Sequence, residues 1–520
     1  MKFPFISALL VVLLVIQDAR ALSHAVTINN THTVDSVLIG AWYFGGWFNC
    51  SPAPCYSHFH GFTPTGTPVD NFFTFYPERM PLLGLYSNNV STVTAEVKAA
   101  DAAGLDFFHV LYYDDDGEQE CGPNPDPNLS PCLDVALAFM LNTTSVWENT
   151  TGRLHFALAY SNDVDRSRSS MFVGSAGRIE WLSRVTTWVK AMTHPRYLTV
   201  GGRPVFQVLI PDIFLLQCGG NVTLAQELLD MFRSAGRAAG VGAPVIGGGW
   251  LSPSIKPGSS NAPLPHPQGY MLYTNTDIPC ENCNLGHITV TAPAICMNQC
   301  NVTAGCTAFV YYNANNTCVL KNSAGPGAHG LGDTYVRVSE DIEWEWRGTY
   351  NSAVPLCYSG VNHTDPGNCP QYANSWLPNA TATGGKIFPY ADVLKFQADA
   401  RGNQSDDSVP YVPNVIASFD PRPWEETAPA FTDPSRDEWT AALSQARDFV
   451  IDPSNKIFGI PDITSPSGIR PVISIYAWNE LGEGGILAPT AYDGCMKLQV
   501  LSQVFSRGGT NASCGGGGGD

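Results

Sequence analysis

Eight apolar runs of six to nine residues, most of them followed by a helical pattern, constrain the fold of this chain more than any other feature. The runs are hydrophobic throughout rather than at alternate positions, which indicates parallel strands buried on both faces. We predict strands over 37–44, 105–113, 153–160, 205–210, 244–249, 269–274, 412–418 and 471–478. Apolar residues at helical spacing predict helices over 91–103, 133–141, 178–192, 224–239, 390–400 and 437–449.

Eight apolar strands, seven of them followed by at least some helical signal, predict an α/β fold, a (β/α)8 barrel of the TIM type. A doubly wound open sheet is the alternative, because Gly and Pro blur several strand boundaries. No strand is followed by a dinucleotide-binding glycine fingerprint or by a Walker loop, and we expect no cofactor. In a barrel, the chemistry belongs to side chains at the C-terminal ends of the strands.

Composition narrows the class of partner. With 44% hydrophobic and 14% charged residues, the 520-residue chain is globular rather than disordered. A formal net charge of -18 would repel phosphate backbones and anionic lipids, so we expect no nucleic acid or membrane-surface partner. Neutral or cationic ligands fit better.

The N-terminal segment has the pattern of a secretory signal peptide, which we place at 1–21. Lys2 precedes an apolar run over 6–16, and Ala19-Arg20-Ala21 resembles a cleavage site. An uncleaved anchor is the alternative, but the run is shorter than the ~20 residues that span a bilayer. Thirteen Asn-x-Ser/Thr sequons add to the expectation of a secreted, extracellular glycoprotein, with passage through the secretory lumen. A Gly-rich flexible tail is predicted over 509–520.

Fifteen cysteines in an exported chain should mostly form disulfides. Sequence alone does not fix the pairing, but three pairs would close short loops rich in Pro, Gly and Asn. These candidate pairs are Cys50/Cys55, Cys121/Cys132 and Cys357/Cys369. The odd total leaves at least one thiol over, and Cys514 in the tail is the expected one.

A cysteine-dense segment interrupts the strand–helix alternation. Residues 278–340 contain Cys296-x3-Cys300-x5-Cys306-x11-Cys318. This pattern resembles the PAN/apple module, a small disulfide-rich α+β domain, and the resemblance implies the pairs Cys300/Cys306 and Cys296/Cys318. It also implies a protein or carbohydrate ligand for the module.

A zinc site that uses Cys280-x2-Cys283 and Cys296-x3-Cys300 is the rival interpretation of this segment, which oxidising export disfavours; we expect no metal. The segment would be an insertion after the sixth strand, between a first barrel part at 22–277 and a second at 341–508.

Aromatic and polar side chains gather at the predicted strand ends, as expected of a site that stacks sugar rings and bonds their hydroxyls. Core packing is the alternative for each aromatic residue taken alone. The candidate sugar contacts are Trp42, Tyr43, Tyr112, Asp114, Trp250, Asp420, Arg422, Trp478 and Asn479. Arg422 could also orient a glutamate, or form a purely structural ion pair with Asp420.

Two glutamates follow the last strand. Glu480 and Glu483 stand three residues apart in "YAWNELGEGG", and on a turn or first helical turn both would face one side. Retaining glycosidases hold two carboxyl groups roughly 5–5.5 Å apart, one acting on the sugar and one on the leaving oxygen. A solvated acidic loop is the plain alternative, which Trp478 and Asn479 disfavour because neither is needed for a turn.

The same stretch resembles the signature of the WbsX-like proteins, relatives of the endo-alpha-mannosidases of glycoside hydrolase family 99. Further blocks resemble this family in the same order: "IGAWYFGGWF", "FYPERMPLLGLY", "AADAAGLDFFHVLYY" and "ASFDPRPW". The resemblance spans 37–490 apart from the cysteine-rich insertion. It implies a barrel that hydrolyses glycans at alpha-linked mannose or a similar sugar.

By resemblance, Glu480 would be the base that activates the sugar 2-hydroxyl, and Glu483 the acid/base at the leaving oxygen and at water. A conventional glycosyl-enzyme at either residue is also open. Leu481 stands where the family often has an aromatic residue, and Gly482 replaces a bulkier polar one, so the resemblance does not fix the sugar or the linkage.

Two other functions fit parts of the sequence. A lumenal glycosyltransferase would use Asp114-Asp115-Asp116 to hold a metal and a nucleotide sugar, although acidic runs are ordinary in solvated loops. A non-catalytic adhesive protein would bind glycan with the barrel and a partner with the PAN/apple-like module.

Overall fold

The computed structural model describes residues 36–47, 71–113, 132–162, 170–250, 387–404, 409–423, 430–455 and 458–507, with shorter segments between them. The predicted signal peptide, the Gly-rich tail and Asp114 lie outside the described residues, as do Cys50, Cys55, Cys121, Cys357, Cys369 and Cys514. Cys132 is described only by its backbone. Within the described part of the chain, no helix is long and apolar enough to cross a membrane.

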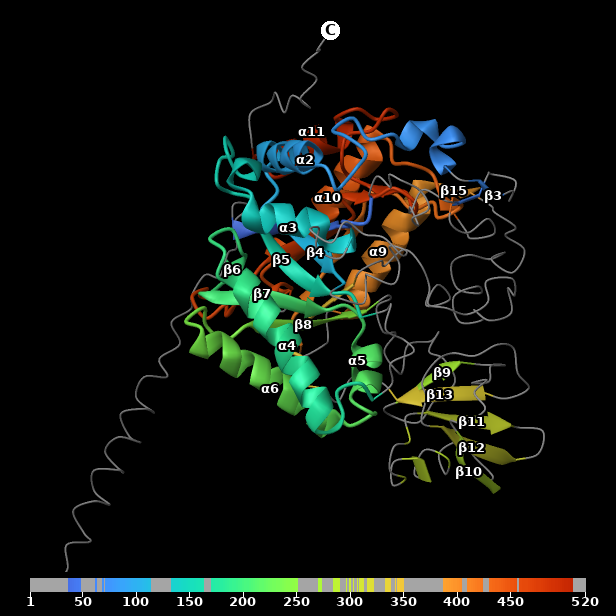
Figure 1. Ribbon diagram of the computed structural model, residues 1–520. Helices are drawn as coiled ribbons and strands as arrows, with labels where there is room; N and C mark the ends of the chain where they lie inside the picture. The colour runs from blue at the N-terminus through green and yellow to red at the C-terminus, as the bar shows by residue number, and fades with distance from the viewer. Residues whose placement is uncertain are drawn as a thin grey trace, which may run out of the picture. The chain divides into compact units, whose positions relative to one another are not determined.

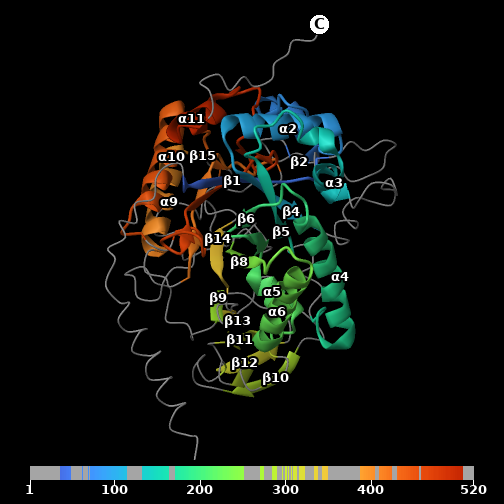
Figure 2. The ribbon, with the colours of Figure 1, turned by 90° about the vertical axis from the view of Figure 1, so that its left-hand side faces the viewer.

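Parallel strands form the centre of the molecule, surrounded by helices (Figures 1 and 2). Each strand pairs in parallel with its neighbour along the chain, apart from one break between the short strands at 411–412 and 414–416, and the last pairs with the first, Leu38 lying opposite Val472. The strands are β1 (Leu38–Tyr43), β4 (Phe107–Tyr112), β5 (His155–Tyr160), β7 (Arg203–Val208), β8 (Val245–Trp250), β14 (Trp346–Thr349), β16 (Tyr411–Val412), β17 (Asn414–Ile416) and β21 (Val472–Tyr476).

Pro413 interrupts the strand that closes this sheet into a barrel. β16 and β17 are separated only by Pro413, which has no N–H to give to a neighbouring strand. β16 pairs with β14 and β17 pairs with β21, while the Pro413 carbonyl accepts a 3.0 Å hydrogen bond from Ser474. The two pieces are therefore one seventh strand, and eight parallel strands close into the predicted barrel.

One of the eight predicted barrel strands is indeed a strand, but it does not belong to the barrel. Residues 269–274 contain a strand, β9 (Tyr270–Tyr273), but β9 pairs antiparallel with β13 (Asp333–Arg337), outside the barrel. The sixth barrel strand is β14, which lies beside β8 and was not predicted. The insertion consequently follows the fifth strand rather than the sixth, and the predicted first barrel part, 22–277, includes one strand of the other sheet.

The predicted helices are present, with ends that follow from their caps. Asn89 and Asn221 accept hydrogen bonds from the first-turn amides of α2 and α6, and Ser435 and Glu438 form a capping box on α10. Gly104 ends α2 with a φ of 89°, a left-handed conformation suited to glycine. The helices are α2 (Val90–Ala103), α3 (Val135–Asn142), α4 (Gly174–Met192), α5 (Pro211–Gln217), α6 (Val222–Ala238), α9 (Tyr390–Gln404), α10 (Arg436–Ile451) and α11 (Met496–Val504).

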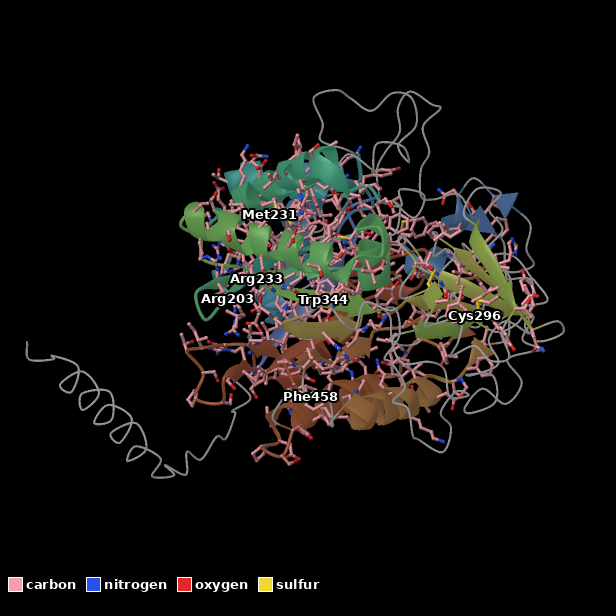
Figure 3. All side chains as sticks on the ribbon, turned by 90° about the horizontal axis from the view of Figure 1, so that it is seen from below. Arg203, Met231, Arg233, Cys296, Trp344 and Phe458 are labelled. Carbon is pink, nitrogen blue, oxygen red and sulfur yellow. A yellow bond between two sulfur atoms is a disulfide. The ribbon has the colours of Figure 1, made fainter. Side chains whose placement is uncertain are left out.

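The unexpected strand β14 is held at its start by an ion-pair cluster. Glu345 directly precedes β14 and accepts from Arg203 of β7 at 2.6 Å and from Arg233 of α6 at 3.0 Å. Figure 3 labels the two arginines, which lie close together. Its backbone N–H donates to the Ile246 carbonyl at 3.1 Å. Because both arginines are largely buried, this cluster fixes the re-entry of the chain into the barrel after the insertion.

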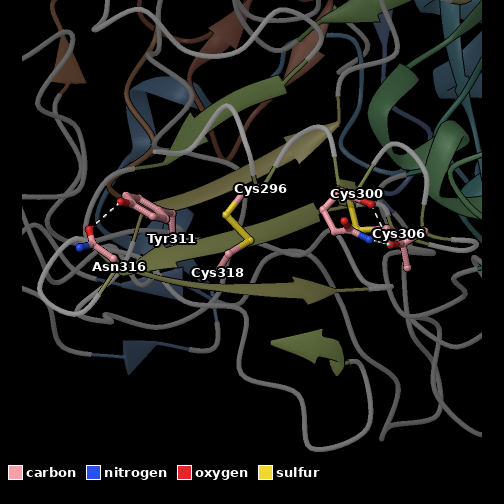
Figure 4. Close-up of a disulfide and its surroundings, with 8 residues drawn as sticks. Cys296, Cys300, Cys306, Tyr311, Asn316 and Cys318 are labelled. Carbon is pink, nitrogen blue, oxygen red and sulfur yellow. Dashed lines mark hydrogen bonds between the residues drawn. A yellow bond between two sulfur atoms is a disulfide. The ribbon is translucent and has the colours of Figure 1, made fainter. Parts of the chain in front are cut away.

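The insertion contains an antiparallel sheet in the order β10-β12-β11-β13-β9. Cys318, on β12 (Thr317–Lys321), is bonded to Cys296, and Cys300 is bonded to Cys306, which confirms both pairs implied by the resemblance (Figure 4). Tyr311, on β11 (Ala308–Tyr312), donates a 3.0 Å hydrogen bond to Asn316 in the connection to β12. β10 spans Asn284–Thr289.

Candidate active site

The chain forms a short hairpin where the eighth barrel strand ends. β22 (Asn479–Glu480) pairs antiparallel with β23 (Gly485–Ile486), so that Glu480 lies opposite Gly485 and residues 481–484 make the turn. Gly484 has a φ of 75°, and a Cβ there would stand 2.9 Å from the backbone nitrogen of Asp420. Glycine therefore permits both the turn and its close approach to the chain after the seventh strand.

A tyrosine of the barrel fixes the Glu483 carboxylate. Val472 and Ser474 line a small cavity inside the barrel, so the alternation along β21 turns Tyr476 to the same inner side. The Tyr476 hydroxyl donates a hydrogen bond to Oε2 of Glu483. Because Tyr476 is the last residue of β21, Glu483 stands over the barrel interior at the C-terminal face, where barrel enzymes place their chemistry.

Glu480 is more enclosed than Glu483. The Glu480 residue is 3% exposed, whereas Glu483 is half-buried. Removal of a carboxylate from water is costly unless polar groups replace the water. A nearly buried acid beside a more open one, on one turn, gives the two carboxyl groups different environments, which is how enzymes assign two acids two roles.

A charged cluster packs against the hairpin. Asp420 accepts two hydrogen bonds from Arg422, at 2.7 and 2.8 Å, and a third from Arg79 at 2.5 Å. Burial alone would raise the pKa of Asp420, but the hydrogen bonds and positive charges of the two arginines outweigh it and lower that pKa. The hydrogen bond to Asp420 in turn raises the pKa of Arg422. Asp420 and Arg422 are therefore both charged at neutral pH.

The cluster is joined to the backbone of the hairpin. The Asp420 N–H donates to the Glu483 carbonyl at 2.7 Å, and Arg79 donates to the carbonyls of Leu481 and Gly482 at 3.1 and 3.2 Å. The predicted neighbours Asp420 and Arg422 therefore do lie beside Glu483. Their charges are largely directed at each other and at Arg79.

Three predicted sugar contacts are buried in the packing of the barrel. Trp42 is 1% exposed and stacks on His109 with ring centroids 4.3 Å apart, inside the barrel. Tyr43 donates to Glu96 at 2.6 Å, and Trp478 is fully buried with its ring against Phe108. This burial favours the core-packing alternative for Trp42, Tyr43 and Trp478.

Asn479 joins the hairpin to the first strand. Its side-chain oxygen accepts from the Phe44 N–H and its amide donates to the Phe44 carbonyl, both at 2.8 Å, and its own carbonyl accepts from the Trp47 indole. These bonds favour a structural role for the side chain, which holds the hairpin at the C-terminal end of β1.

The remaining candidates stay predictions. Tyr112, the last residue of β4, is 8% exposed. Trp250 ends β8, and its side chain is not among the described ones. No group of three His, Cys, Asp or Glu side chains that could hold a metal ion occurs in the described part of the chain.

Sequence reasoning missed three residues of the site: Tyr76, Arg79 and Tyr476. Tyr76 is 3% exposed, and its ring lies 4.8 Å from the Arg79 guanidinium carbon. A signal was present, because "FYPERMPLLGLY" sets one arginine in a largely apolar block. Nothing in the sequence indicates which distant residue that arginine meets.

Comparison with known proteins gives one family and a set of structures. Residues 280–336 match the family model of the PAN domain. No curated protein matches the chain. Among solved structures, the chain is similar to a glycoside hydrolase-like protein, at 10% identity and a TM-score of 0.45, with 90% of this chain and 94% of that chain covered.

The chain is also similar to the family 99 endo-alpha-mannosidase from Bacteroides thetaiotaomicron, at 12% identity and a TM-score of 0.39, with 91% and 97% covered. The same enzyme in complex with bis-tris propane gives 11% identity and a TM-score of 0.37, with 91% and 99% covered. At these identities and TM-scores the comparison assigns no activity and no residue role to this chain.

Proposed function

We propose that this protein is a secreted glycoside hydrolase that cleaves glycans or polysaccharides with retention of configuration, using Glu480 and Glu483. One observation carries the proposal: both acids come from a single hairpin at the C-terminal mouth of a closed parallel barrel, where the Tyr476 hydroxyl orients the Glu483 carboxylate. Alpha-mannosidic linkages are the first to test, because the signature around these acids resembles that of endo-alpha-mannosidases.

The two acids divide the reaction between them. Glu480 takes the proton from the sugar 2-hydroxyl, whose oxygen attacks the anomeric carbon of the same sugar, while Glu483 gives its proton to the leaving oxygen as the glycosidic bond breaks. Glu483 then takes a proton from water, whose oxygen opens the three-membered ring at the anomeric carbon, and Glu480 returns its proton to the 2-oxygen. Two displacements at one carbon give net retention.

The environments of the acids support this division. Glu480 lies in the enclosed strand of the hairpin, suited to a sugar that seals the site from water. Glu483 stands in the more open turn, where a leaving group and then water can reach it. Tyr112, Asp114 and Trp250, at the ends of the second and fifth strands, are proposed sugar contacts, with Asp420 and Arg422 at the edge of the site.

The setting of the site fits an extracellular enzyme. Disulfides of the kind seen in the PAN-like insertion persist in oxidising compartments. We expect the N-terminal segment to be cleaved on export. We propose that the insertion binds a protein or carbohydrate ligand that lies close to the glycan substrate.

The test begins with purified mature protein screened against mannans, other polysaccharides and N-glycans, without nucleotide or metal. Glu480→Gln and Glu483→Gln keep shape and most hydrogen bonding but remove acid/base capacity, so each should lower kcat by about 100-fold or more. Glu227→Gln, on the outer surface of α6, is the matched control and should be neutral. Proton NMR of the first-formed product should show the substrate's anomeric configuration. Full activity in the Glu480→Gln/Glu483→Gln double variant would falsify the catalytic assignment.

A further inference from the structure

Arg79 spans the turn that separates the two proposed catalytic acids. It ends the short 3-10 helix Pro77–Arg79 and is 6% exposed. Its Nη1 donates to the carbonyl oxygens of Leu481 and Gly482, at 3.1 and 3.2 Å. These are the only two residues between Glu480 and Glu483, so one guanidinium holds the crown of the turn.

The other arm of the guanidinium holds a fixed anchor. Nη2 lies 2.5 Å from Oδ2 of Asp420, whose carboxylate also accepts both bonds from Arg422. The Asp420 backbone N–H bonds the Glu483 carbonyl at 2.7 Å. The turn is therefore tied to Asp420 twice, once directly through Glu483 and once through Arg79.

The segment that carries Arg79 is held independently of its side chain. Met80 accepts a backbone hydrogen bond from Ala491 at 2.9 Å, and Leu82 donates one to Pro489 at 2.9 Å. Substitution of Arg79 should consequently remove the clamp and leave the segment where it is.

We propose that Arg79 is a positioning residue: its fork fixes the 481–482 backbone against Asp420 and so sets the separation and direction of the two glutamates. This inference rests on the proposed function for its catalytic consequence, but the clamp itself is a property of the hairpin. Only arginine suits the role, because one planar fork serves the two carbonyls and the carboxylate together, whereas lysine is a point charge that satisfies one side.

Arg79→Lys and Arg79→Met test the inference in the full-length mature protein. Hydrogen exchange of the peptide that covers residues 477–488 reports on the hairpin without any substrate, and we expect faster exchange in both variants. We expect kcat to fall by about 100-fold, as for a misplacement near 1 Å, with KM changing less. Free guanidinium should restore part of the kcat of Arg79→Ala. Arg178→Lys, in an exposed ion pair with Glu227, is the control and should change none of these readouts.

Tyr76→Leu is the second variant, should loss of Arg79 unfold the protein. It removes the ring that lies near the guanidinium and leaves every hydrogen bond of Arg79, so a smaller rise in exchange and a smaller fall in kcat are expected. Unchanged exchange and unchanged kcat in the folded Arg79→Lys protein would overturn the inference while Glu483→Gln still tests the function separately. Activity that survives Glu480→Gln/Glu483→Gln would overturn the proposed function, and faster hairpin exchange in Arg79→Lys would then still support the clamp.

Discussion

The Tyr43 hydroxyl donates a 2.6 Å hydrogen bond to the carboxyl group of Glu96, and both side chains are buried between β1 and α2. Burial raises the pKa of Glu96 to about 7, although the hydrogen bond from Tyr43 acts in the opposite direction. Glu96 is thus a carboxyl group that the fold keeps protonated at mildly acidic pH.

This pair predicts a pH-dependent stability. In the unfolded chain Glu96 loses its proton near pH 4.5, whereas in the folded protein it keeps the proton to about pH 7. Stability from this group is complete below pH 4.5 and is lost as the pH rises to 7, by an amount on the order of 3 kcal/mol. Urea unfolding of the wild type and of Glu96→Gln between pH 4.5 and 8 measures how the unfolding free energy changes with pH. The same pH dependence in both proteins would exclude Glu96 as its source.

We expect the ion pairs of Glu345 to contribute more to the free energy of unfolding than the solvent-exposed ion pair of Glu227. Glu345→Ala leaves the largely buried Arg203 without its carboxylate and leaves Arg233 with Asp230 alone, and we expect a loss of about 2 kcal/mol in unfolding free energy. The matched control is Glu227→Ala, whose partner Arg178 is 42% exposed, with an expected loss below about 1 kcal/mol. Equal losses for the two variants in denaturant unfolding would mean that Glu345 does not anchor β14.

The two disulfides of the insertion should differ in effect. The bond Cys296–Cys318 closes a longer loop, with a sequence separation of 22, than Cys300–Cys306, with a separation of 6. Chain entropy then gives about 3 kcal/mol for the first and about 2 kcal/mol for the second. Paired Cys→Ala variants compared by limited proteolysis should show faster cleavage within 284–337 for the longer loop. The reverse order would mean that native-state packing, not loop length, sets the effect.

Cys218 should be chemically silent in the native protein. It is a free cysteine, fully buried after α5, and burial raises the pKa of its thiol. Alkylation with iodoacetamide at pH 8, followed by peptide mass spectrometry, should leave Cys218 unmodified when folded and modify it in urea. Rapid native labelling at this residue would show that α5 opens readily.

The barrel strands were predictable because a strand buried on both faces is hydrophobic at nearly every position, which gives a continuous apolar run in the sequence. β14 was not predicted because it is only four residues long and lies in the charged stretch "DIEWEWRG". The segment 269–274 was correctly read as extended, but local composition does not specify which sheet a strand joins. Pairing partners are set by the tertiary fold.

The site divides in the same way. The placement of Glu480 and Glu483 on one turn was predictable because the two residues stand three apart and the turn between them is local. Arg79 meets Leu481 across 402 residues of chain, and Tyr476 is recognisable only once β21 is known to turn it inward. The burial of Trp42 and Tyr43 likewise depends on how β1 is oriented in the barrel, which the motif "IGAWYFGGWF" does not specify.

The insertion affects the order in which the barrel can be made. Ninety-five residues, 251–345, separate β8 from its neighbour β14. At about 5–20 residues per second, a ribosome needs roughly 5–20 s to reach β14 after finishing β8. During that interval the edge of β8 has no partner strand, so we expect chaperones that cover unpaired strand edges to aid folding of the nascent chain until β14 is made.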